Sequence, residues 1–517
     1  MLLQHLFGGD SNSLRFRMRV AGLSSLPTVE DDPAAKRARK PPNPRVGNLD
    51  SVCALDRWRH GAFDSLWWRK HFVNEGTWTK DSWWYLDFRK KFRVPPCLFT
   101  ELKGESSNIK RFADSSSPLF KTKGGPPRIP LDLKMAACLR VLATGCQFDA
   151  CEEAAGLDKE TLRRFFHDWM AHLADNIAPR YIKPPQGAEL DACLAVYAKL
   201  GFPGACMSVD ATHCPWDRVP SAQHAAHKGK ESFPSLVWNC HVTHDGQFRH
   251  VELAQAGARN DKTLAHYDWL MQSIKNGSLY SDKVFSLYDE NGNVTRVSGL
   301  YLICDGGYHM WRCCQFPLKH GSDIWTRRWS KRMESVRKDV ERAFGIVKKR
   351  FRILKVPFLF KDAKAIHNVF VVCCMLHNRL LKFDGLHKLG RAEQDWIKAS
   401  LTADDARVDA QNSAWTADAR RACAANHDVD VERHAAHFEL RDQLMVHYRY
   451  CWQHQLVNWR VTAAQRAARI GNAHAHLDPN ADPLEEEEES DDVDDSSHSS
   501  HSDSMLSSAD ESDHDDL

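Results

Sequence analysis

No Cys-x-x-Cys pair occurs among the 16 cysteines of this 517-residue chain. The spacing that is typical of structural zinc sites is therefore missing. Cys313 and Cys314 are adjacent in sequence, as are Cys373 and Cys374, and adjacent cysteines suit neither a shared metal ion nor a structural disulfide. We predict free, mostly buried thiols in a reducing compartment.

Long apolar stretches are also missing. The longest uninterrupted apolar run is residues 369–376, far shorter than the roughly 20 residues that a membrane-spanning helix needs. The first residues, Met1 to Phe7, are apolar, but they lack the basic region and the cleavage site of a secretory signal. We expect no membrane partner and no secretory leader.

Basic residues are absent from one end of the chain. Residues 484–517 contain 15 acidic residues and no Lys or Arg, although the whole chain has 70 basic and 68 acidic residues. Without that stretch, 70 basic residues face 53 acidic ones, a net charge of +17. The near-neutral total therefore hides a basic body that suits a polyanionic partner such as DNA. It also hides an acidic, serine-rich tail, residues 478–517, that we expect to be disordered.

The first 129 residues divide into two segments by composition. Residues 1–50 are rich in Pro, Ser and charge and are predicted to be disordered. Their basic cluster, Lys36 to Lys40, resembles a nuclear-import signal and predicts a nuclear protein, although short basic runs are also common solvated features. Residues 51–129 interleave tryptophans with basic residues. Such a segment either stacks on nucleic acid or forms a small helical subdomain with a tryptophan core.

Residues 130–198 are predicted to be helical. A periodic apolar pattern over residues 131–142 ends at Gly145, and a short helix over 148–155 is followed by a turn at Gly156. The next helix makes this a helix-turn-helix signature. With Asp158 as the N-cap, the side chains that would face DNA are Lys159, Thr161, Arg163 and Arg164. Helical hairpins also occur as plain packing units, and the pattern leaves both interpretations open.

From residue 199 to 385 the pattern changes to short β-rich runs and then to helix. Strands are predicted at 205–209, 235–242, 248–253 and 299–304, and helices at 262–274 and 331–351. Strands with helices around them predict an α/β fold with a mixed sheet. Residues 386–477 are predicted to be a helical C-terminal extension, whose role the sequence does not assign.

Three acidic residues stand where a predicted rigid element ends or presents an edge. Asp210 follows the first strand, Asp305 follows the last, and Glu341 lies at the border of the apolar stripe on the basic helix. Each alone is more typical of a turn or a cap. Together, three carboxylates from two strand ends and a helix would bind two Mg²⁺ or Mn²⁺ ions. Such a pair activates a water or a 3′-hydroxyl at a phosphodiester and stabilises the leaving oxygen.

Several short motifs resemble those of the PIF/Harbinger superfamily of transposases, especially its plant-type branch. In chain order they are Gly201-Phe202-Pro203-Gly204, Val209-Asp210-Ala211-Thr212-His213 with Pro215-Trp216, His227-Lys228-Gly229-Lys230, Gly257-Ala258-Arg259-Asn260-Asp261, Asp305-Gly306-Gly307-Tyr308, Arg337 to Gly345 and Cys374-Met375-Leu376-His377-Asn378. Their order and spacing agree with the family from about Gly201 to Leu381. Ala211 stands where relatives commonly carry Gly or Cys, a conservative departure.

This resemblance implies an RNase H-like catalytic domain with Asp210, Asp305 and Glu341 as a DDE triad that binds Mg²⁺ or Mn²⁺. Members of the family cut double-stranded DNA at terminal inverted repeats and join the 3′ ends to short A/T-rich target sites, often with a Myb/SANT-like partner protein. A homo-oligomer is left open. The alternative function is a domesticated relative, a DNA-binding or adaptor protein without transposition activity.

Other residues are candidates for supporting roles. Asp261 matches a family motif and either orders a loop or binds metal, and His213 and His309 either orient the scissile phosphate or fix their loops. Lys348, Lys349 and Arg350 belong to the basic segment 327–352, which has 11 basic and three acidic residues, and they are predicted to contact DNA phosphates.

The remaining titratable residues of interest are rivals that we rank lower. Glu334 shares a helix face with Glu341 but lacks the motif around it. Asp339 is predicted to be a solvated partner of Arg342 or Lys338. The histidine pairs His224/His227 and His434/His437 have zinc-like spacing without a second pair of ligands.

Overall fold

A computed structural model describes residues 66–72, 82–109, 111–112, 129–229, 232–318, 323–381, 383–384, 430–454 and 456. The predicted basic segment 1–50 with its import-like cluster, the acidic tail 478–517 and most of the extension 386–477 lie outside these residues. None of the helices that the structure describes combines the length and the apolar character of a membrane span.

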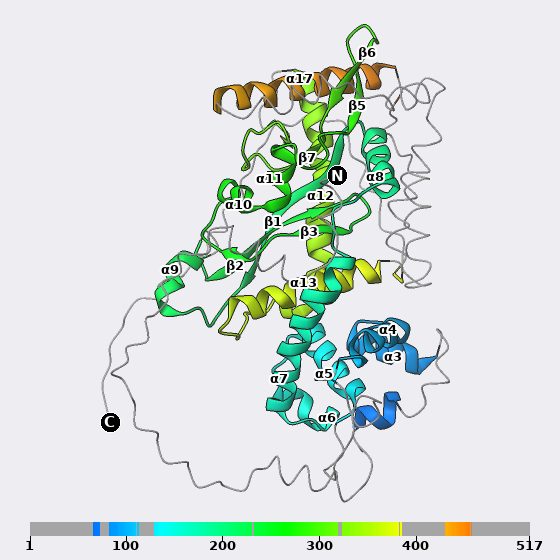
Figure 1. Cartoon of the computed structure of the whole chain (residues 1–517), viewed down its shortest axis with the longest axis vertical. Helices are drawn as coiled ribbons and strands as arrows, with labels where there is room; N and C mark the ends of the chain where they lie inside the picture. Colours follow the sequence, from blue (N-terminus) through cyan, green and yellow to red (C-terminus); the bar gives the residue numbers. More distant parts are fainter. Residues whose placement is uncertain are drawn as a thin grey trace, which may run out of the picture.

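A mixed sheet forms the centre of the molecule (Figure 1). Its strands are β1 (Ala205–Pro215), β2 (Ser235–Val242), β3 (Phe248–Val251), β4 (Gln255–Ala256), β7 (Tyr301–Ile303) and β8 (Cys314–Gln315), in the order β3-β2-β1-β7-β8, with β4 paired to β2. The β1–β2 and β2–β3 pairs are antiparallel, whereas β7 and β8 run parallel to β1. A central mixed sheet flanked by helices is compatible with an RNase H-like domain.

Both faces of the sheet are covered. Every residue of β2 is buried, as expected for a strand between helical layers. The strand predictions at 205–209 and 299–304 locate β1 and β7, but β1 continues six residues past Val209, so Asp210 lies within a strand rather than after one. The sequence analysis also missed a separate hairpin, β5 (Val284–Tyr288) and β6 (Val294–Ser298).

The longest helix, α12 (Ile324–Arg350), packs against β1 and β2. Asp323 caps its N-terminus by accepting the amides of Trp325 and Thr326, so the helix begins seven residues before the predicted start. Its apolar stripe is buried as predicted, at Met333, Val336, Val340, Phe344 and Val347. The helix therefore lies with one face on the sheet and its charged face outward.

The predicted helix 262–274 is two helices. They are α10 (Asp261–Tyr267) and α11 (Trp269–Lys275), and Asp268 between them has an extended backbone and accepts the amide of Met271 as an N-cap. The other helices that follow β1 are η6 (Ser221–Gln223), α9 (His224–His227), η7 (Arg352–Leu354), α13 (Ala363–Leu380) and α17 (Asp430–Gln453). Helix α17 lies beside β5 and β6 at one end of the sheet (Figure 1).

A helical part precedes the sheet and lies at its other end, next to α13 (Figure 1). It contains η1 (Trp68–Phe72), α3 (Trp83–Phe92), α4 (Pro96–Ser107), α5 (Leu131–Thr144), η3 (Asp149–Cys151), α6 (Glu152–Ala155), α7 (Lys159–His172), η4 (Leu173–Ile177) and η5 (Ala178–Arg180). Helix α8 (Ala188–Lys199) follows these helices and packs against β1, on the side of the sheet near β5 (Figure 1). Gly145 ends α5 in the left-handed conformation, with φ 68°, as glycine at a helix end allows. The tryptophans of the segment 51–129 differ in burial, since Trp67 is buried but Trp83 is 58% exposed. Only some of these tryptophans therefore belong to a hydrophobic core.

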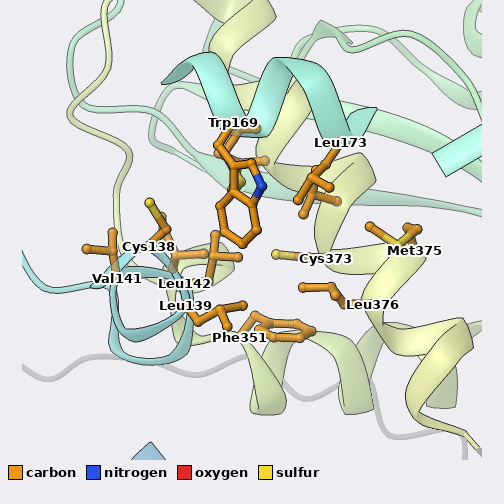
Figure 2. Packing of buried hydrophobic residues seen from close by; sticks show 14 of the residues in the cluster. Cys138, Leu139, Val141, Leu142, Trp169, Leu173, Phe351, Cys373, Met375 and Leu376 are labelled. Carbon is orange, nitrogen blue, oxygen red and sulfur yellow. The ribbon is translucent and has the colours of Figure 1, made fainter. Parts of the chain in front are cut away.

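One hydrophobic core joins this helical part to the sheet domain. Trp169 of α7 packs among α5 residues, Phe351 and α13 residues such as Cys373 and Leu376 (Figure 2). The Trp169 indole also donates a hydrogen bond of 2.9 Å to the Ser106 hydroxyl of α4. Because these side chains are fully buried, the helical part and the sheet domain pack together through one shared hydrophobic core.

The cysteines agree with the sequence prediction. All 14 cysteines that the structure describes are free, and 11 of them are buried. Burial raises the pKa of thiols such as Cys206, Cys240 and Cys374, so these thiols stay protonated and behave as small apolar side chains.

Candidate active site

The first acid of the predicted triad, Asp210, lies on the central strand β1, and its side chain is 23% exposed. Its Oδ1 atom accepts the backbone amide of Ala211 at 2.9 Å. Ser208, two residues before it, pairs with Ile303 of the parallel strand β7. Asp305 stands two residues after Ile303, as Asp210 stands two residues after Ser208, so both acids follow the same paired position of neighbouring strands.

The second acid, Asp305, follows β7 in a tight turn. Its Oδ1 atom accepts the amide of Gly306 at 2.6 Å, and its carbonyl accepts the amide of Tyr308 at 3.2 Å. Because β7 runs parallel to β1 and ends at Ile303, opposite Ser208, it ends beside the middle of β1, which continues to Pro215. That Asp305 joins Asp210 in one site stays a prediction.

The third acid, Glu341, comes from α12 and is joined to Asp210 by an arginine. The Arg337 guanidinium lies 3.4 Å from Asp210 Oδ2 through Nη1 and 2.8 Å from Glu341 Oε1 through Nη2. Arg337 precedes Glu341 by four residues, so both side chains project from the same helix face. Glu341 is 44% exposed and so remains accessible to solvent and ligand.

Burial and charge act in opposite directions on Asp210. Desolvation is the largest influence and raises the pKa of Asp210 to about 6, with Glu341 and Asp261 adding repulsion. The Ala211 amide and the Arg337 cation favour the charged form and reduce the rise. Carboxylates that are partly shielded from water repel one another, and a bound cation would reduce this repulsion and stabilise their charged forms.

Asp261 belongs to the same cluster. It is the first residue of α10, after the N-cap Asn260, whose side chain accepts the Thr263 amide. A Cβ atom placed on Gly307 would lie 2.4 Å from Asp261 Oδ2, so this carboxylate presses on the backbone of the turn that carries Asp305. The predicted loop-ordering position of Asp261 agrees with this contact, and the charge of Asp261 also reaches Asp210.

The two candidate histidines make structural contacts. His213 lies three residues after Asp210 on β1, hence on the opposite sheet face, and its Nδ1 atom is 3.0 Å from the Ser235 hydroxyl. His309 lies with Nε2 3.1 Å from the Lys262 carbonyl and stacks on Trp311. The structure thus places His213 away from the acids and uses His309 to fasten the Asp305 turn to α10.

The three basic residues at the end of α12 differ in their surroundings. Lys348 donates to the His213 carbonyl at 2.7 Å, and Arg350 is paired with Asp384. Lys349 is exposed. Further up the same helix, Lys338 and Arg342 are also exposed, so they offer positive charge on the outer face near Glu341.

The lower-ranked acids of α12 also have defined places. Asp339 is buried rather than solvated as predicted, because its carboxylate pairs with both His244, at 2.5 Å, and Arg342, at 3.0 Å. Glu334 is exposed. Asp339 therefore stabilises the packing of α12 and is turned away from the triad.

The predicted recognition residues lie on the solvent face of α7. Lys159, Thr161, Arg163 and Arg164 are exposed, and Asp158 accepts the amide of Thr161 at 2.8 Å, as predicted for the N-cap. Glu160 binds both arginines, at 2.7 and 2.9 Å. The preceding helix α6 is only four residues long, shorter than the sequence indicated.

A histidine and two acids form the group of described residues whose possible ligand atoms all lie within 4.8 Å of one another: His250, Glu252 and Asp268. Their oxygens already accept hydrogen bonds, since Glu252 accepts the amides of Leu253 and Trp269, and Asp268 accepts the amide of Met271. Among the described residues, the ligand atoms of Asp210, Asp305 and Glu341 do not all lie within 4.8 Å of one another. In the pairs with zinc-like spacing, His227 Nδ1 lies 3.0 Å from the Ser235 carbonyl and His437 Nδ1 lies 3.2 Å from the Trp311 carbonyl.

Four residues around the site escaped the sequence analysis as functional candidates: Arg337, Asn239, Asp268 and Tyr308. The i,i+4 spacing of Arg337 and Glu341 was a usable signal. Asn239 gave none, because it stands in the middle of a predicted buried strand, and only the tertiary fold places it beside Tyr308 and Asp268.

Comparisons with known proteins match the central part of the chain. Residues 179–386 match the family described as "Plant transposon protein". The chain is 22% identical over 270 residues to "Protein ALP1-like" from Arabidopsis thaliana, a match that covers 51% of this chain and 64% of that relative, less than two thirds of its length. No solved structure matches the chain. Residues 179–386 thus resemble plant transposon proteins, and both matches support the predicted relationship to the PIF/Harbinger superfamily.

Proposed function

We propose that this protein is a metal-dependent DNA endonuclease and transposase. It would cut phosphodiester bonds at the inverted-repeat ends of its element and join the 3′ ends to target DNA. The observation that carries the proposal is the Arg337 guanidinium of α12, which lies 3.4 Å from Asp210 of β1 and 2.8 Å from Glu341. The parallel pairing of β1 with β7, the strand that Asp305 follows, supports a place for Asp305 in the same site.

The residues present fit a pair of hard divalent cations. Their donors are carboxylate oxygens, which Mg²⁺ and Mn²⁺ prefer, and one cation, the Arg337 guanidinium, already lies between two of them. Two such ions, when bound by Asp210, Asp305 and Glu341, would supply an activated water or 3′-hydroxyl and stabilise the leaving oxygen. Asp261, whose charge acts on Asp210, is placed to add a fourth carboxylate.

The chain's own residues would bind and align the DNA. Exposed Lys338, Arg342 and Lys349 would bind phosphates beside the triad, since charge neutralisation supplies most non-specific affinity. Exposed Arg163 and Arg164 of α7 would contact DNA as part of a helix-turn-helix. In the same proposal the protein acts in the nucleus on double-stranded inverted-repeat DNA and A/T-rich target sites, with a Myb/SANT-like accessory protein.

The direct test is a cleavage assay with triad variants. Purified protein, the accessory protein and Mn²⁺ are incubated with DNA carrying the element's ends, and 3′-end cleavage and strand transfer are measured. Asp210→Asn, Asp305→Asn and Glu341→Gln are expected to reduce the rate about a thousandfold, because metal-ion catalysis is worth several kcal/mol. Glu334→Gln, an exposed glutamate seven residues before Glu341 on the same helix, is the matched control and should keep the wild-type rate.

Cleavage that survives Asp305→Asn would overturn the proposal. A second candidate function is a DNA-binding or adaptor protein that keeps the fold without catalysis. It is favoured by Arg337, whose guanidinium already forms ion pairs with both Asp210 and Glu341. DNA binding without cleavage by the wild-type protein, under conditions where Mn²⁺ binding is measured, would establish this second function.

A further inference from the structure

A buried relay of hydrogen bonds connects the turn that carries Asp305 to strand β2. We propose that Asp268, Asn239 and Tyr308 are positioning residues that fix the Asp305 carboxylate for metal binding, an inference that rests on the proposed function. The relay joins the break between α10 and α11 to the turn after β7 through the middle of β2.

The relay is a chain of short contacts. The Tyr308 hydroxyl donates to Asn239 Oδ1 at 2.5 Å, and Asn239 Nδ2 donates to Asp268 Oδ2 at 2.7 Å. His241 Nε2 lies 2.9 Å from the same Asp268 oxygen, and the other Asp268 oxygen accepts the Met271 amide at 2.8 Å. All of these side chains are buried, with Asp268 and His241 fully so.

The chemistry of the groups allows only one direction for the relay. Burial acts to raise the pKa of Asp268, but His241, His250 and hydrogen bonds to the carboxylate hold it at about 2. An ionised carboxylate only accepts hydrogen bonds, so the Asn239 amide must turn its NH₂ group toward Asp268. Its carbonyl then faces Tyr308, and Tyr308 must donate. The direction of the Tyr308 hydrogen bond is therefore set by a buried charge.

The same turn also contacts helix α10. Gly307 lies against the Asp261 carboxylate, and His309 lies 3.1 Å from the Lys262 carbonyl. Tyr308 thus connects the turn to the sheet through Asn239, whereas Gly307 and His309 contact α10. The Tyr308 amide completes the turn by donating to the Asp305 carbonyl at 3.2 Å.

Such support matters because metal sites tolerate little displacement. Ligands need to be held within about 0.5 Å of their productive positions, and loss of an outer-shell partner typically costs 10- to 100-fold in metal affinity. Asp305 has no hydrogen bond from a neighbouring strand to its side chain among the contacts the structure records, only the Gly306 amide of its own turn. Its placement therefore depends on the turn, and the turn depends on Tyr308.

The test compares two tyrosines of the same core. Tyr308→Phe removes the hydroxyl of the relay. Tyr280→Phe, the matched control, removes an equally buried hydroxyl that donates to the Pro185 carbonyl at 2.7 Å, outside the triad's strands. In the full-length protein, Mn²⁺ affinity is measured by electron paramagnetic resonance, and amide hydrogen exchange is measured for residues 306–309. Asn239→Ser serves as a second variant that breaks the relay while leaving the tyrosine ring in place.

We expect Tyr308→Phe to weaken Mn²⁺ binding about tenfold and to speed amide exchange at residues 306–309, while Tyr280→Phe changes neither. Equal effects of the two tyrosine variants, or unchanged exchange in both Tyr308→Phe and Asn239→Ser, would overturn the relay. A wild-type protein that binds no Mn²⁺ would refute the proposed function instead. The exchange comparison would still decide whether Tyr308 positions the turn.

Discussion

Replacing Asp210 by asparagine should make the metal-free protein more stable at neutral pH. Asp210 is held largely out of water, and desolvation raises its pKa from 3.8 to about 6. A raised carboxyl pKa means that the folded state binds the proton more tightly than the unfolded state does. The unfolding free energy therefore falls as pH rises from about 3.8 to about 6, and at higher pH the full cost of the buried charge remains.

The size of the effect follows from the shift. A change of about two pKa units corresponds to about 3 kcal/mol at pH 7. Asparagine has nearly the same shape and no charge, so Asp210→Asn should add up to about this amount, or roughly 6 to 12 °C in melting temperature for a domain of this size. Arg337 keeps Glu341 as a partner in the variant, so its own charge stays paired.

Urea unfolding in the presence of a chelator, at pH 4 and at pH 7.5, measures this difference. Asp210→Asn should gain stability over the wild type at pH 7.5 and little at pH 4. Asp339→Asn is the control, because that buried carboxylate is paired with His244 and Arg342, and its loss should destabilise. An Asp210→Asn protein that is less stable than the wild type at pH 7.5 would refute the electrostatic account of the site.

Four further outcomes are expected. Arg337→Gln removes a cation that lowers the pKa of Asp210, so Mn²⁺ binding in a pH titration should reach half-strength at a higher pH than in the wild type. Gly307→Ala places a methyl group 2.4 Å from a carboxylate oxygen, and we expect a loss of about 1–3 kcal/mol in urea unfolding. Replacing Arg163 and Arg164 by alanine should reduce the salt dependence of DNA binding, with a change in slope of up to about two in a log–log plot. Deleting residues 484–517 should raise non-specific DNA affinity if that acidic stretch competes with DNA, and unchanged affinity and salt dependence would exclude the competition.

Local patterns in the sequence located most elements of the sheet domain. The apolar runs predicted β2 at its observed bounds, and the stripe on α12 predicted its buried face. The boundaries were less well predicted. Asp210 was expected after a strand, yet β1 continues to Pro215, because its pairing with β2 extends through the polar residues that follow Val209.

Buried polar residues explain the larger errors. Asp268 interrupts what reads as one continuous helix, since it leaves the helical backbone to cap α11 and to accept hydrogen bonds from Asn239 and His241. Asp339 looks like a solvated surface acid by its helical position, but His244 arrives from the β2–β3 turn and buries it. The positions of Asp268 and Asp339 both depend on contacts with residues distant in sequence. The periodicity of apolar residues within one segment does not predict such contacts.

Motif resemblance singled out Asp210, Asp305 and Glu341 as the candidate acids. The structure joins Asp210 and Glu341 through Arg337, a cation that was not among the predicted site residues, and the place of Asp305 in the same site stays a prediction. For the basic residues at the end of α12, sequence alone could not separate exposed Lys349 from Arg350, which is paired with Asp384. The difference depends on Asp384, which follows α13 and is distant from α12 in sequence.

Diffraction at the manganese absorption edge, from crystals of the protein with Mn²⁺ and element-end DNA, tests the central claim most directly. The account predicts anomalous peaks about 2.0–2.3 Å from carboxylate oxygens of Asp210 and Asp305, with Glu341 completing the site. Arg337 should then have moved off Asp210. A manganese peak at His250, Glu252 and Asp268 with none at the triad would contradict the account.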